Sequence, residues 1–335
     1  MRPSTKRKWQ LAIGMLVSVG ALALALSGID LRRVAETLAH AKYAYLLPAT
    51  VGIFAYLLAR AIRWRILLGP RVSLARCFWV TNIGYLVSNV LPFRLGDPAR
   101  AVVIGLGGHV STAAALSTVV VERVLDMVMV VLILAGVLPF VGEAGSAMSA
   151  AGILAGAAAL VASAVLVLLA LRPDWGHAIV RWGLHRLPFL DEARWATVFD
   201  GLFEGLAPLR SGRRGLALLA WSVVIWACVV GYYWMFLEAF VGDAPPLAAP
   251  FLVCTVGLGM AVPSSPGALG VFQAVARYAL TIPFDVPEEL AVAAAFGSHA
   301  FQYVLMCLLG LAGLAREGLS LGWLRQQATD VGEGE

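Results

Sequence analysis

Two short segments interrupt the apolar pattern of this chain with Pro, Gly and polar residues. The first covers residues 89–100, with the sequence NVLPFRLGDPAR, and the second covers residues 263–273, with the sequence PSSPGALGVFQ. Each lies between apolar stretches that are too short to cross a membrane comfortably. Irregular backbone at membrane depth is tolerated only where protein buries it or where it lines a polar cavity. We therefore expect both segments to be tips of hairpins that enter the membrane and return.

The composition identifies an integral membrane protein. The 335-residue chain is 60% hydrophobic and 13% charged, with a mean hydropathy of +0.84, whereas about a quarter of the residues are charged in soluble domains. In a soluble protein, the net charge of +5 would indicate a nucleic-acid partner. In a membrane protein, the basic residues of each loop instead indicate the orientation, so no nucleic-acid partner is predicted. The four cysteines lie in apolar stretches without paired spacing, which predicts neither disulfides nor a metal site. No cofactor is expected.

Apolar runs of about 20 residues predict six membrane-spanning helices. They lie at residues 9–27, 43–59, 113–140, 147–171, 215–240 and 290–314. The two broken segments then form re-entrant helical hairpins at about 77–108 and 250–281. The first apolar run follows four basic residues and could be a signal peptide, but its length favours a retained anchor. The predicted fold class is an all-α integral membrane protein with six full spans and two re-entrant hairpins.

The distribution of basic residues predicts the orientation. With a cytoplasmic N-terminus, most of the 25 Lys and Arg residues fall in the expected cytoplasmic parts, which are residues 1–8, 60–76, 172–214 and 315–335. The later external loops carry only acidic residues. This asymmetry follows the positive-inside rule, so both termini are predicted to be cytoplasmic.

The same topology predicts a single polytopic membrane domain, residues 1–320, followed by a polar tail at 321–335. Residues 43–140 read as span, hairpin and span, and residues 215–314 repeat this order in the opposite orientation, as in an inverted-topology repeat. Residues 172–214 mix Arg with aromatic residues, which predicts an amphipathic cytoplasmic loop on anionic lipids of the inner leaflet. A second interpretation of this loop is a docking surface for an envelope-biosynthesis enzyme.

Both hairpin tips contain a pattern typical of a helix start. Asp97 and Ser265 each precede a Pro, as an N-cap residue precedes Pro at the first helical position. We therefore expect two helix N-termini near the membrane centre, where free N–H groups accept anions. Arg94 and Arg100 add positive charge beside the first. Three glycines are expected to let a headgroup approach the backbone closely: Gly96, Gly267 and Gly270.

The helix after the first hairpin carries charges within a predicted span. Glu122 and Asp126 are four residues apart and share one helix face, and Arg123 lies beside Asp126 at a spacing of three. A charge within a span costs about 2.5–3.5 kcal/mol, and these residues together with the first hairpin contribute equal numbers of positive and negative charges. One interpretation is a headgroup site. The other is a buried ionic lock that holds the hairpin to the helix and binds no ligand.

Other polar and aromatic residues receive structural interpretations. Arg60, Arg63 and Arg65 are expected to mark the inner end of the second span, with Trp64 in an interface belt, although Arg60 could reach the first hairpin. Arg277 is expected to snorkel outward. His299 is expected to be a hydrogen-bonded core histidine.

Taken in order, these motifs resemble a known family. The motifs are Arg63-Trp64, the segment from Pro92 to Arg100, Glu122-Arg123-x-x-Asp126 and Ser265-Pro266-Gly267-x-x-Gly270. They are similar to the lysylphosphatidylglycerol synthase transmembrane-region family, over about residues 10–320. That family is the flippase-like domain of the bacterial multiple peptide resistance factor and its stand-alone relatives.

The resemblance implies movement of lipid-linked groups between the leaflets of the bacterial cytoplasmic (inner) membrane. The substrates implied are aminoacylated phosphatidylglycerol in two-domain members, and polyprenyl-linked sugars, glycolipids or hopanoids in single-domain relatives. The positions that match the family pattern are Arg94, Asp97, Arg100, Glu122, Arg123, Asp126, Pro266, Gly267 and Gly270.

The chain departs from the family pattern in the second hairpin. Gln273 stands where relatives usually have Glu, and Ala268 stands where a second Gly is usual. The first departure argues against a mechanism that needs a carboxylate at this position. The chain ends at Glu335 without a soluble aminoacyl-transferase domain, so we do not expect it to aminoacylate a lipid itself.

The sequence therefore predicts a flippase-like transporter of an anionic or polyprenyl-phosphate-linked lipid, and not an enzyme. No ATP-binding motif is visible, so transport would be facilitated or ion-coupled, and a homo-oligomer is compatible with the sequence. The alternative is a membrane enzyme or accessory subunit of envelope lipid or glycolipid biosynthesis, with the acids of the first hairpin region as acid/base groups or metal ligands. The predicted substrate-binding residues are Arg94, Gly96, Asp97, Arg100, Glu122, Arg123, Asp126, Ser264, Ser265, Gly267, Gly270 and Gln273.

Overall fold

The computed structural model describes residues 5–91, 95–141, 211–260 and 264–320, with isolated positions at 172, 174–175, 178 and 322; of residues 5–13 it describes the backbone alone. The predicted span at 147–171 lies outside the described residues. So do nearly all of the predicted loop 172–214 and tail 321–335, and Arg94 of the first hairpin.

The described residues form ten α-helices, three short 3-10 helices and no strand, which confirms the all-α prediction for this part of the chain. The long helices are α1 (Thr5–Leu26), α3 (Leu46–Leu68), α6 (Thr112–Val137), α10 (Gly212–Phe240) and α13 (Glu288–Glu317). Shorter ones are α2 (Leu31–Ala39), α4 (Leu74–Val90), α5 (Gly96–Gly105), α11 (Ala248–Gly259) and α12 (Val271–Phe284). The 3-10 helices are η1 (Tyr43–Tyr45), η3 (Leu138–Phe140) and η5 (Pro266–Ala268).

Four described helical segments are long and apolar enough to cross a membrane: Tyr43–Leu68, Thr112–Phe140, Gly212–Phe240 and Glu288–Glu317. They coincide with four of the predicted spans. The predicted first span falls in α1, which meets α2 at an angle of 83° and supplies a fifth span if the bent pair is counted as one. The chain is therefore a multi-pass membrane protein.

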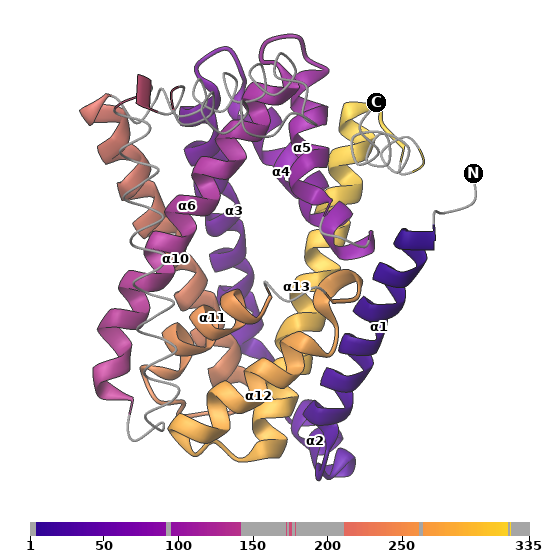
Figure 1. Ribbon diagram of the computed structural model, residues 1–335. Helices are drawn as coiled ribbons and strands as arrows, with labels where there is room; N and C mark the ends of the chain where they lie inside the picture. The colour runs from indigo at the N-terminus through magenta and orange to yellow at the C-terminus, as the bar shows by residue number, and fades with distance from the viewer. Residues whose placement is uncertain are drawn as a thin grey trace.

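Two pairs of shorter helices lie at the positions of the predicted hairpins. In Figure 1, α4 and α5 extend inward from the upper end of the bundle, and α11 and α12 extend inward from the lower end. In the same view, the ends of α4 and α11 that precede the breaks lie near the middle of the bundle. Tyr303 on α13 connects the two hairpins. Its hydroxyl donates to the carbonyl oxygen of Asn89 at 3.2 Å, and its ring lies against Gly267.

Packing between the two halves of the chain holds the bundle together. The helix α3 lies along α10, α13 packs against α4, and α11 packs against α6. One apolar cluster buries Leu57 of α3, Phe236 of α10 and Phe251 of α11. A second cluster buries Ile83 of α4 and Ile104 of α5. Each hairpin thus packs on long helices from both halves.

The first helix packs against the second hairpin, and Arg277 of α12 joins the two. One terminal nitrogen of Arg277 donates to the carbonyl oxygens of Leu24, Ala25 and Ser27 at 2.8–3.2 Å, and the other pairs with Glu288 at 2.6 Å. The last carbonyl groups of a helix lack partners within the helix, and this guanidinium supplies one. The expectation that Arg277 snorkels outward is wrong, since the residue is buried.

Candidate functional site

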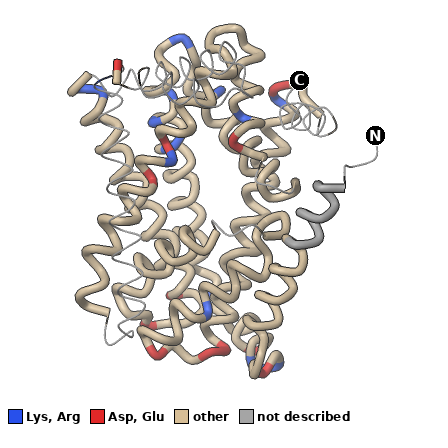
Figure 2. Tube along the Cα trace, in the orientation of Figure 1, with Lys and Arg blue, Asp and Glu red and all other residues tan. Residues whose placement is uncertain are grey.

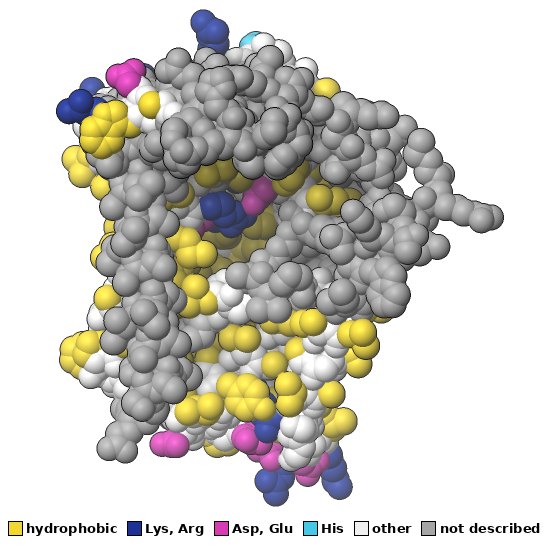
Figure 3. Space-filling view, viewed as in Figure 1, with side chains coloured by type: hydrophobic (Ala, Val, Ile, Leu, Met, Phe, Trp, Pro, Cys, Tyr) yellow, Lys and Arg dark blue, Asp and Glu magenta, His cyan; other side chains and the backbone are white. Residues whose placement is uncertain are grey.

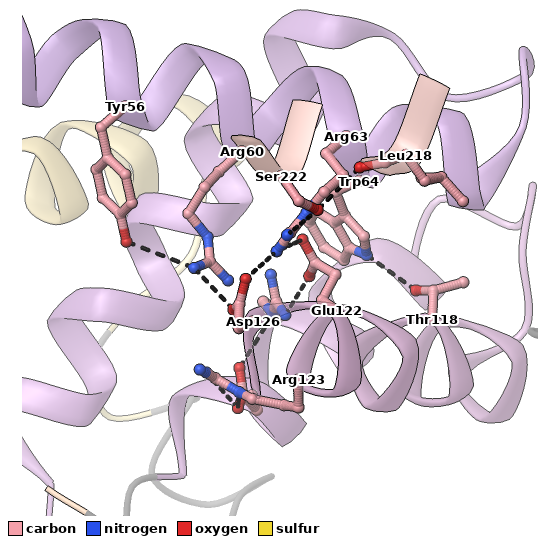
Figure 4. Close-up of polar contacts among 12 residues, drawn as sticks. Tyr56, Arg60, Arg63, Trp64, Thr118, Glu122, Arg123, Asp126, Leu218 and Ser222 are labelled. Carbon is pink, nitrogen blue, oxygen red and sulfur yellow. Dashed lines mark hydrogen bonds and ion pairs between the residues drawn. The ribbon is translucent and has the colours of Figure 1, made fainter. Parts of the chain in front are cut away.

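A cluster of ionic side chains lies within the bundle, between α3, α5 and α6. Figure 2 shows charged positions at both ends of the bundle and a further group inside its upper half. At the centre of this group, Asp126 of α6 accepts from Arg63 at 2.8 Å and from Arg60 at 3.3 Å, both on α3. Figure 4 shows Arg60 and Arg63 converging on Asp126. The Asp126 carboxylate therefore joins two helices.

One turn earlier on α6, Glu122 joins the same cluster to the first hairpin. Its carboxylate pairs with Arg100 of α5 at 2.5 Å and with Arg63 at 3.5 Å. The side chains of Glu122 and Arg63 are fully buried, and Arg63 also donates to the hydroxyl of Ser222 on α10 at 2.9 Å. The prediction that Glu122 and Asp126 share a helix face is confirmed by their common partner, Arg63.

The third carboxylate, that of Asp97, occupies the edge of the cluster. Its Oδ1 lies 3.2 Å from Nε of Arg100, and its Oδ2 accepts from Arg123 Nη2 at 2.7 Å and Nε at 2.9 Å. The expected neighbour of Arg123 was Asp126, three residues along the helix. The ion pair that the structure gives Arg123 is instead with Asp97, from the hairpin.

The charge balance of the described cluster differs from the predicted one. Arg60 and Arg63 belong to it, whereas Arg94 lies outside the described residues, so four guanidinium groups face three carboxylates there. The Nε–H groups of Arg60 and Arg63 are buried without a hydrogen-bond acceptor among the described residues. Leaving such groups unpaired in a low-dielectric interior is costly. With one guanidinium in excess, the described cluster carries a net positive charge.

Trp64 supports the buried side of this cluster. Its indole N–H donates to the hydroxyl of Thr118 at 2.9 Å, and its ring lies 4.7 Å from the guanidinium carbon of Arg100. The expectations that Trp64 lies in an interface belt and that Arg63 marks a span end are wrong, because both side chains are fully buried. A signal was available in the sequence, since Arg60, Arg63 and Trp64 recur at helical spacing on one face of α3.

The cluster lies beside a hollow in the surface. Figure 3 shows basic and acidic side chains together at the floor of this hollow, above an apolar belt. The side chain of Arg123 is 55% exposed and that of Asp97 is 30% exposed. The accessible edge of the cluster is therefore the contact between Asp97 and Arg123.

The polar residues at the tip of the second hairpin form a separate, uncharged group, whereas Arg277 further along α12 pairs with Glu288. The backbone N–H of Gly270 donates to Oε1 of Gln273 at 2.7 Å, and Nε2 of Gln273 lies 3.0 Å from Nδ1 of His299. The N–H of Ser265 donates to the Ser18 hydroxyl on α1 at 2.8 Å. Gln273 and His299 are buried, and the hydrogen bond of His299 agrees with its interpretation as a core histidine. These contacts satisfy the hairpin from within the protein.

The two predicted helix starts are displaced. The helix α5 begins at Gly96 with Leu95 as its N-cap, so Asp97 lies in the first turn and is not the cap. Ser265 precedes only the three-residue η5, and α12 begins at Val271 after Gly270. The helix α12 therefore begins beyond Pro266. At its start, the Gln273 side chain accepts the N–H of Gly270.

The three glycines fit the protein backbone and side chains closely. A Cβ at Gly96 would collide with the carbonyl oxygen of Gly84 on α4, and one at Gly270 would collide with that of Ser18. A Cβ at Gly267 would lie 2.7 Å from the Tyr303 ring. The expectation that these glycines admit a headgroup is wrong, because neighbouring helices fill the space.

The structure thus brings five predicted site residues together: Asp97, Arg100, Glu122, Arg123 and Asp126. It assembles the residues of the second hairpin elsewhere, with Ser264 beside Gly14 of α1. Among the described residues, no group of three or more His, Cys, Asp or Glu side chains is placed to hold a metal ion.

A comparison of the sequence with protein families matches residues 11–310 to the family described as the lysylphosphatidylglycerol synthase TM region. The chain belongs to this family. The family resemblance predicted from the motifs is therefore confirmed, and the buried ionic cluster is built from those motifs. No solved structure matches the chain.

A curated relative adds a second comparison. The chain is similar to glycosyltransferase AglD of Haloferax volcanii, with 26% identity over 377 aligned residues. The alignment covers the whole of this chain and 59% of the relative. The chain therefore spans about three-fifths of the length of that protein.

Proposed function

We propose that this protein moves a lipid with a phosphate-bearing headgroup between the two leaflets of a membrane. The substrate would be an anionic phospholipid or a polyprenyl-phosphate-linked lipid, and the protein would act as a flippase-like transporter and not as an enzyme. The observation that carries this proposal is the ionic cluster of four Arg and three carboxylates inside a multi-pass bundle, at a hollow. Ionisable groups within spans are costly and typically mark transport pathways.

The residues of the cluster have different proposed roles. Arg123 lies at its accessible edge and Arg100 lies next to it, and these two would contact the headgroup, because guanidinium groups bind phosphate oxygens through two parallel hydrogen bonds. Glu122 and Asp126 would position these groups from the buried side. Arg94 is proposed as a further ligand on its sequence position alone.

The proposed transport cycle needs two halves that can move relative to each other. We infer six full spans and two re-entrant hairpins, arranged as inverted repeats over residues 43–140 and 215–314. The packing supports this, because the contact of α4 with α13 has its counterpart in α11 with α6, and the long helices α3 and α10 pair with each other. Sites of such transporters lie near the midplane, and the repeats rock around them.

We propose a bacterial cytoplasmic (inner) membrane location with both termini in the cytoplasm. The support is the excess of basic residues in the parts expected to be cytoplasmic. In this orientation residues 172–214 would lie on anionic lipids of the inner leaflet, and the ionic cluster would lie in the cytoplasmic half of the membrane.

The proposal is tested with purified protein in proteoliposomes that contain a trace of fluorescent phosphatidylglycerol or of a fluorescent polyprenyl phosphate. A membrane-impermeant reductant bleaches the outer-leaflet label. Lipid moved by the protein raises the bleached fraction above the half seen in protein-free vesicles. Bleaching that stays at one half for both lipids would refute transport of this class.

The alternative is a membrane enzyme, or an accessory subunit of one, in envelope lipid or glycolipid biosynthesis. The observation that favours it is the similarity of the chain to glycosyltransferase AglD. Against it, each cluster carboxylate already contacts two guanidinium groups, and so is poorly suited to proton transfer. Sugar transfer by the purified protein from a nucleotide sugar to a polyprenyl phosphate, dependent on a divalent metal, would favour the alternative.

A further inference from the structure

Arg123 differs from the other guanidinium groups of the cluster in its exposure. Its side chain is 55% exposed, whereas those of Arg60, Arg63 and Arg100 are almost entirely buried. Figure 4 shows Arg123 on the side of the cluster away from Arg63 and Trp64. It is therefore the guanidinium that a ligand entering the hollow can reach first.

The reachable guanidinium is already occupied by an internal carboxylate. Both Nη2 and Nε of Arg123 donate to one oxygen of Asp97, at 2.7 and 2.9 Å. Two nitrogens of the guanidinium thus donate to one carboxylate oxygen, and a phosphate oxygen can accept from the same donors. An anionic headgroup that binds Arg123 in this way must displace Asp97.

Asp97 can leave Arg123 and still have a positively charged partner. Its other oxygen, Oδ1, lies 3.2 Å from Nε of Arg100, so the carboxylate keeps a positive partner when the contact to Arg123 opens. The Asp97 side chain is partly exposed, and exposed ion pairs contribute little to stability. The contact between Asp97 and Arg123 is thus the weakest part of the cluster and the easiest to exchange.

This contact also joins two elements of the bundle. Asp97 lies in the first turn of α5, the returning helix of the first hairpin, and Arg123 lies on the long helix α6. Opening this contact removes one ion pair between the hairpin and the long helix. The buried ion pair between Arg100 and Glu122, at 2.5 Å, still joins the two elements.

We propose that Asp97 is an internal competitor that occupies the headgroup position on Arg123. This inference rests on the proposed function, since it assigns to the same site a phosphate-bearing headgroup that exchanges with the Asp97 carboxylate. The entering phosphate takes the two Arg123 donors and Asp97 moves onto Arg100. The return of Asp97 expels the headgroup, so the carboxylate weakens binding and speeds release.

The decisive experiment measures binding in detergent, separately from transport. Fluorescent phosphatidylglycerol is titrated against the wild-type protein and the D97N variant, and inorganic phosphate is used as a competitor in a second arm. The neutral amide of D97N competes poorly for Arg123, so we expect the variant to bind the lipid about fivefold more tightly, the upper range for an exposed ion pair. If inorganic phosphate displaces the fluorescent lipid, the phosphate is the recognised group. If only unlabelled phosphatidylglycerol displaces it, the protein recognises the intact lipid.

A matched control and a second variant keep the test decisive. Glu36→Gln removes the carboxylate of another exposed pair, Arg32 with Glu36 on α2 at 3.1 Å, and should leave lipid affinity unchanged. Arg123→Gln should abolish the binding that D97N strengthens, both alone and combined with D97N. Unchanged or weaker binding by folded D97N overturns the proposal, and if D97N does not fold, retained binding by Arg123→Gln overturns it.

The outcomes separate this inference from the proposed function. Tighter lipid binding by D97N without lipid movement by the wild-type protein would support the competitor and refute transport. Lipid movement by the wild-type protein with identical binding by D97N would support transport and refute the competitor.

Discussion

The two hairpins share a plan but differ in how their polar groups are used. In the first, Asp97 and Arg100 carry full charges, contact the long helix α6 and reach an exposed edge. In the second, Gln273 and Ser265 are neutral and make their hydrogen bonds to neighbouring protein groups. The comparison teaches that a repeated topology does not imply a repeated site. At their tips, one hairpin supplies charge and the other supplies neutral, tightly packed groups, while the charged Arg277 lies further along α12 and pairs with Glu288.

The largest effect on stability is expected from removing the buried carboxylate of Glu122, which pairs with the first hairpin. Glu122→Gln would leave Arg63 and Arg100 without the carboxylate between them, and removing one partner of a buried ion pair costs about 3–5 kcal/mol. We expect this loss in the free energy of unfolding in mixed micelles. The exposed Glu36→Gln is the control, expected to change stability by less than about 0.5 kcal/mol. Equal effects of the two variants would contradict a buried network.

At the tip of the second hairpin, packing should contribute more to stability than charge. Gly270→Ala would force a Cβ against the Ser18 carbonyl at a residue whose φ is +87°, so we expect a loss of about 2–3 kcal/mol. Gly257→Ala on α11 is the matched control, because nothing lies within 4 Å of the added Cβ. An unchanged unfolding midpoint for Gly270→Ala would show that α1 does not pack here as described.

The hydrogen bonds of Gln273 should have a smaller effect. Gln273→Met keeps the side-chain length but removes the acceptor of the Gly270 N–H and the partner of His299, and an unsatisfied buried group costs about 1–3 kcal/mol. Lipid affinity should stay at the wild-type value, because this side chain is outside the charged cluster. A large loss of lipid affinity at preserved stability would instead assign the second hairpin to the headgroup site.

The smallest stability effect is expected at the exposed edge. Arg123→Gln removes a solvent-accessible ion pair worth about 0.2–1 kcal/mol, so the thermal unfolding midpoint should shift little. Lipid binding should nevertheless be lost. A stability loss as large as that of Glu122→Gln would make Arg123 a structural residue.

Sequence patterns predicted the fold better than they predicted the contacts. Hydropathy located four of the predicted spans, and the four-residue spacing of Glu122 and Asp126 placed them on one face. Helical spacing could place Arg63 on one face with Arg60, but it could not identify its partners Asp126 and Ser222, which lie 63 and 159 residues further along the chain. Reading Arg60 and Arg63 as ordinary positive-inside residues therefore removed them from the predicted site.

Local rules also failed at the hairpin tips. The Asp-Pro and Ser-Pro pairs suggested helix starts, but α5 begins before its Pro and α12 begins beyond its Pro. The glycines were predicted to admit a headgroup, but protein groups lie against them. What approaches them depends on tertiary packing, and at Gly270 it is the backbone of α1.

Lipid movement by the Arg123→Gln variant tests most directly whether the ionic cluster is a headgroup site or only a structural lock. Wild-type protein and the variant are reconstituted at equal density, with equal thermal stability confirmed beforehand, and the rate of phosphatidylglycerol movement is measured. A headgroup site predicts that the rate falls at least about tenfold in the variant, as expected for the loss of a charged contact worth about 1.4 kcal/mol or more. Equal rates for the two proteins would contradict the account and leave the cluster a lock that binds no lipid.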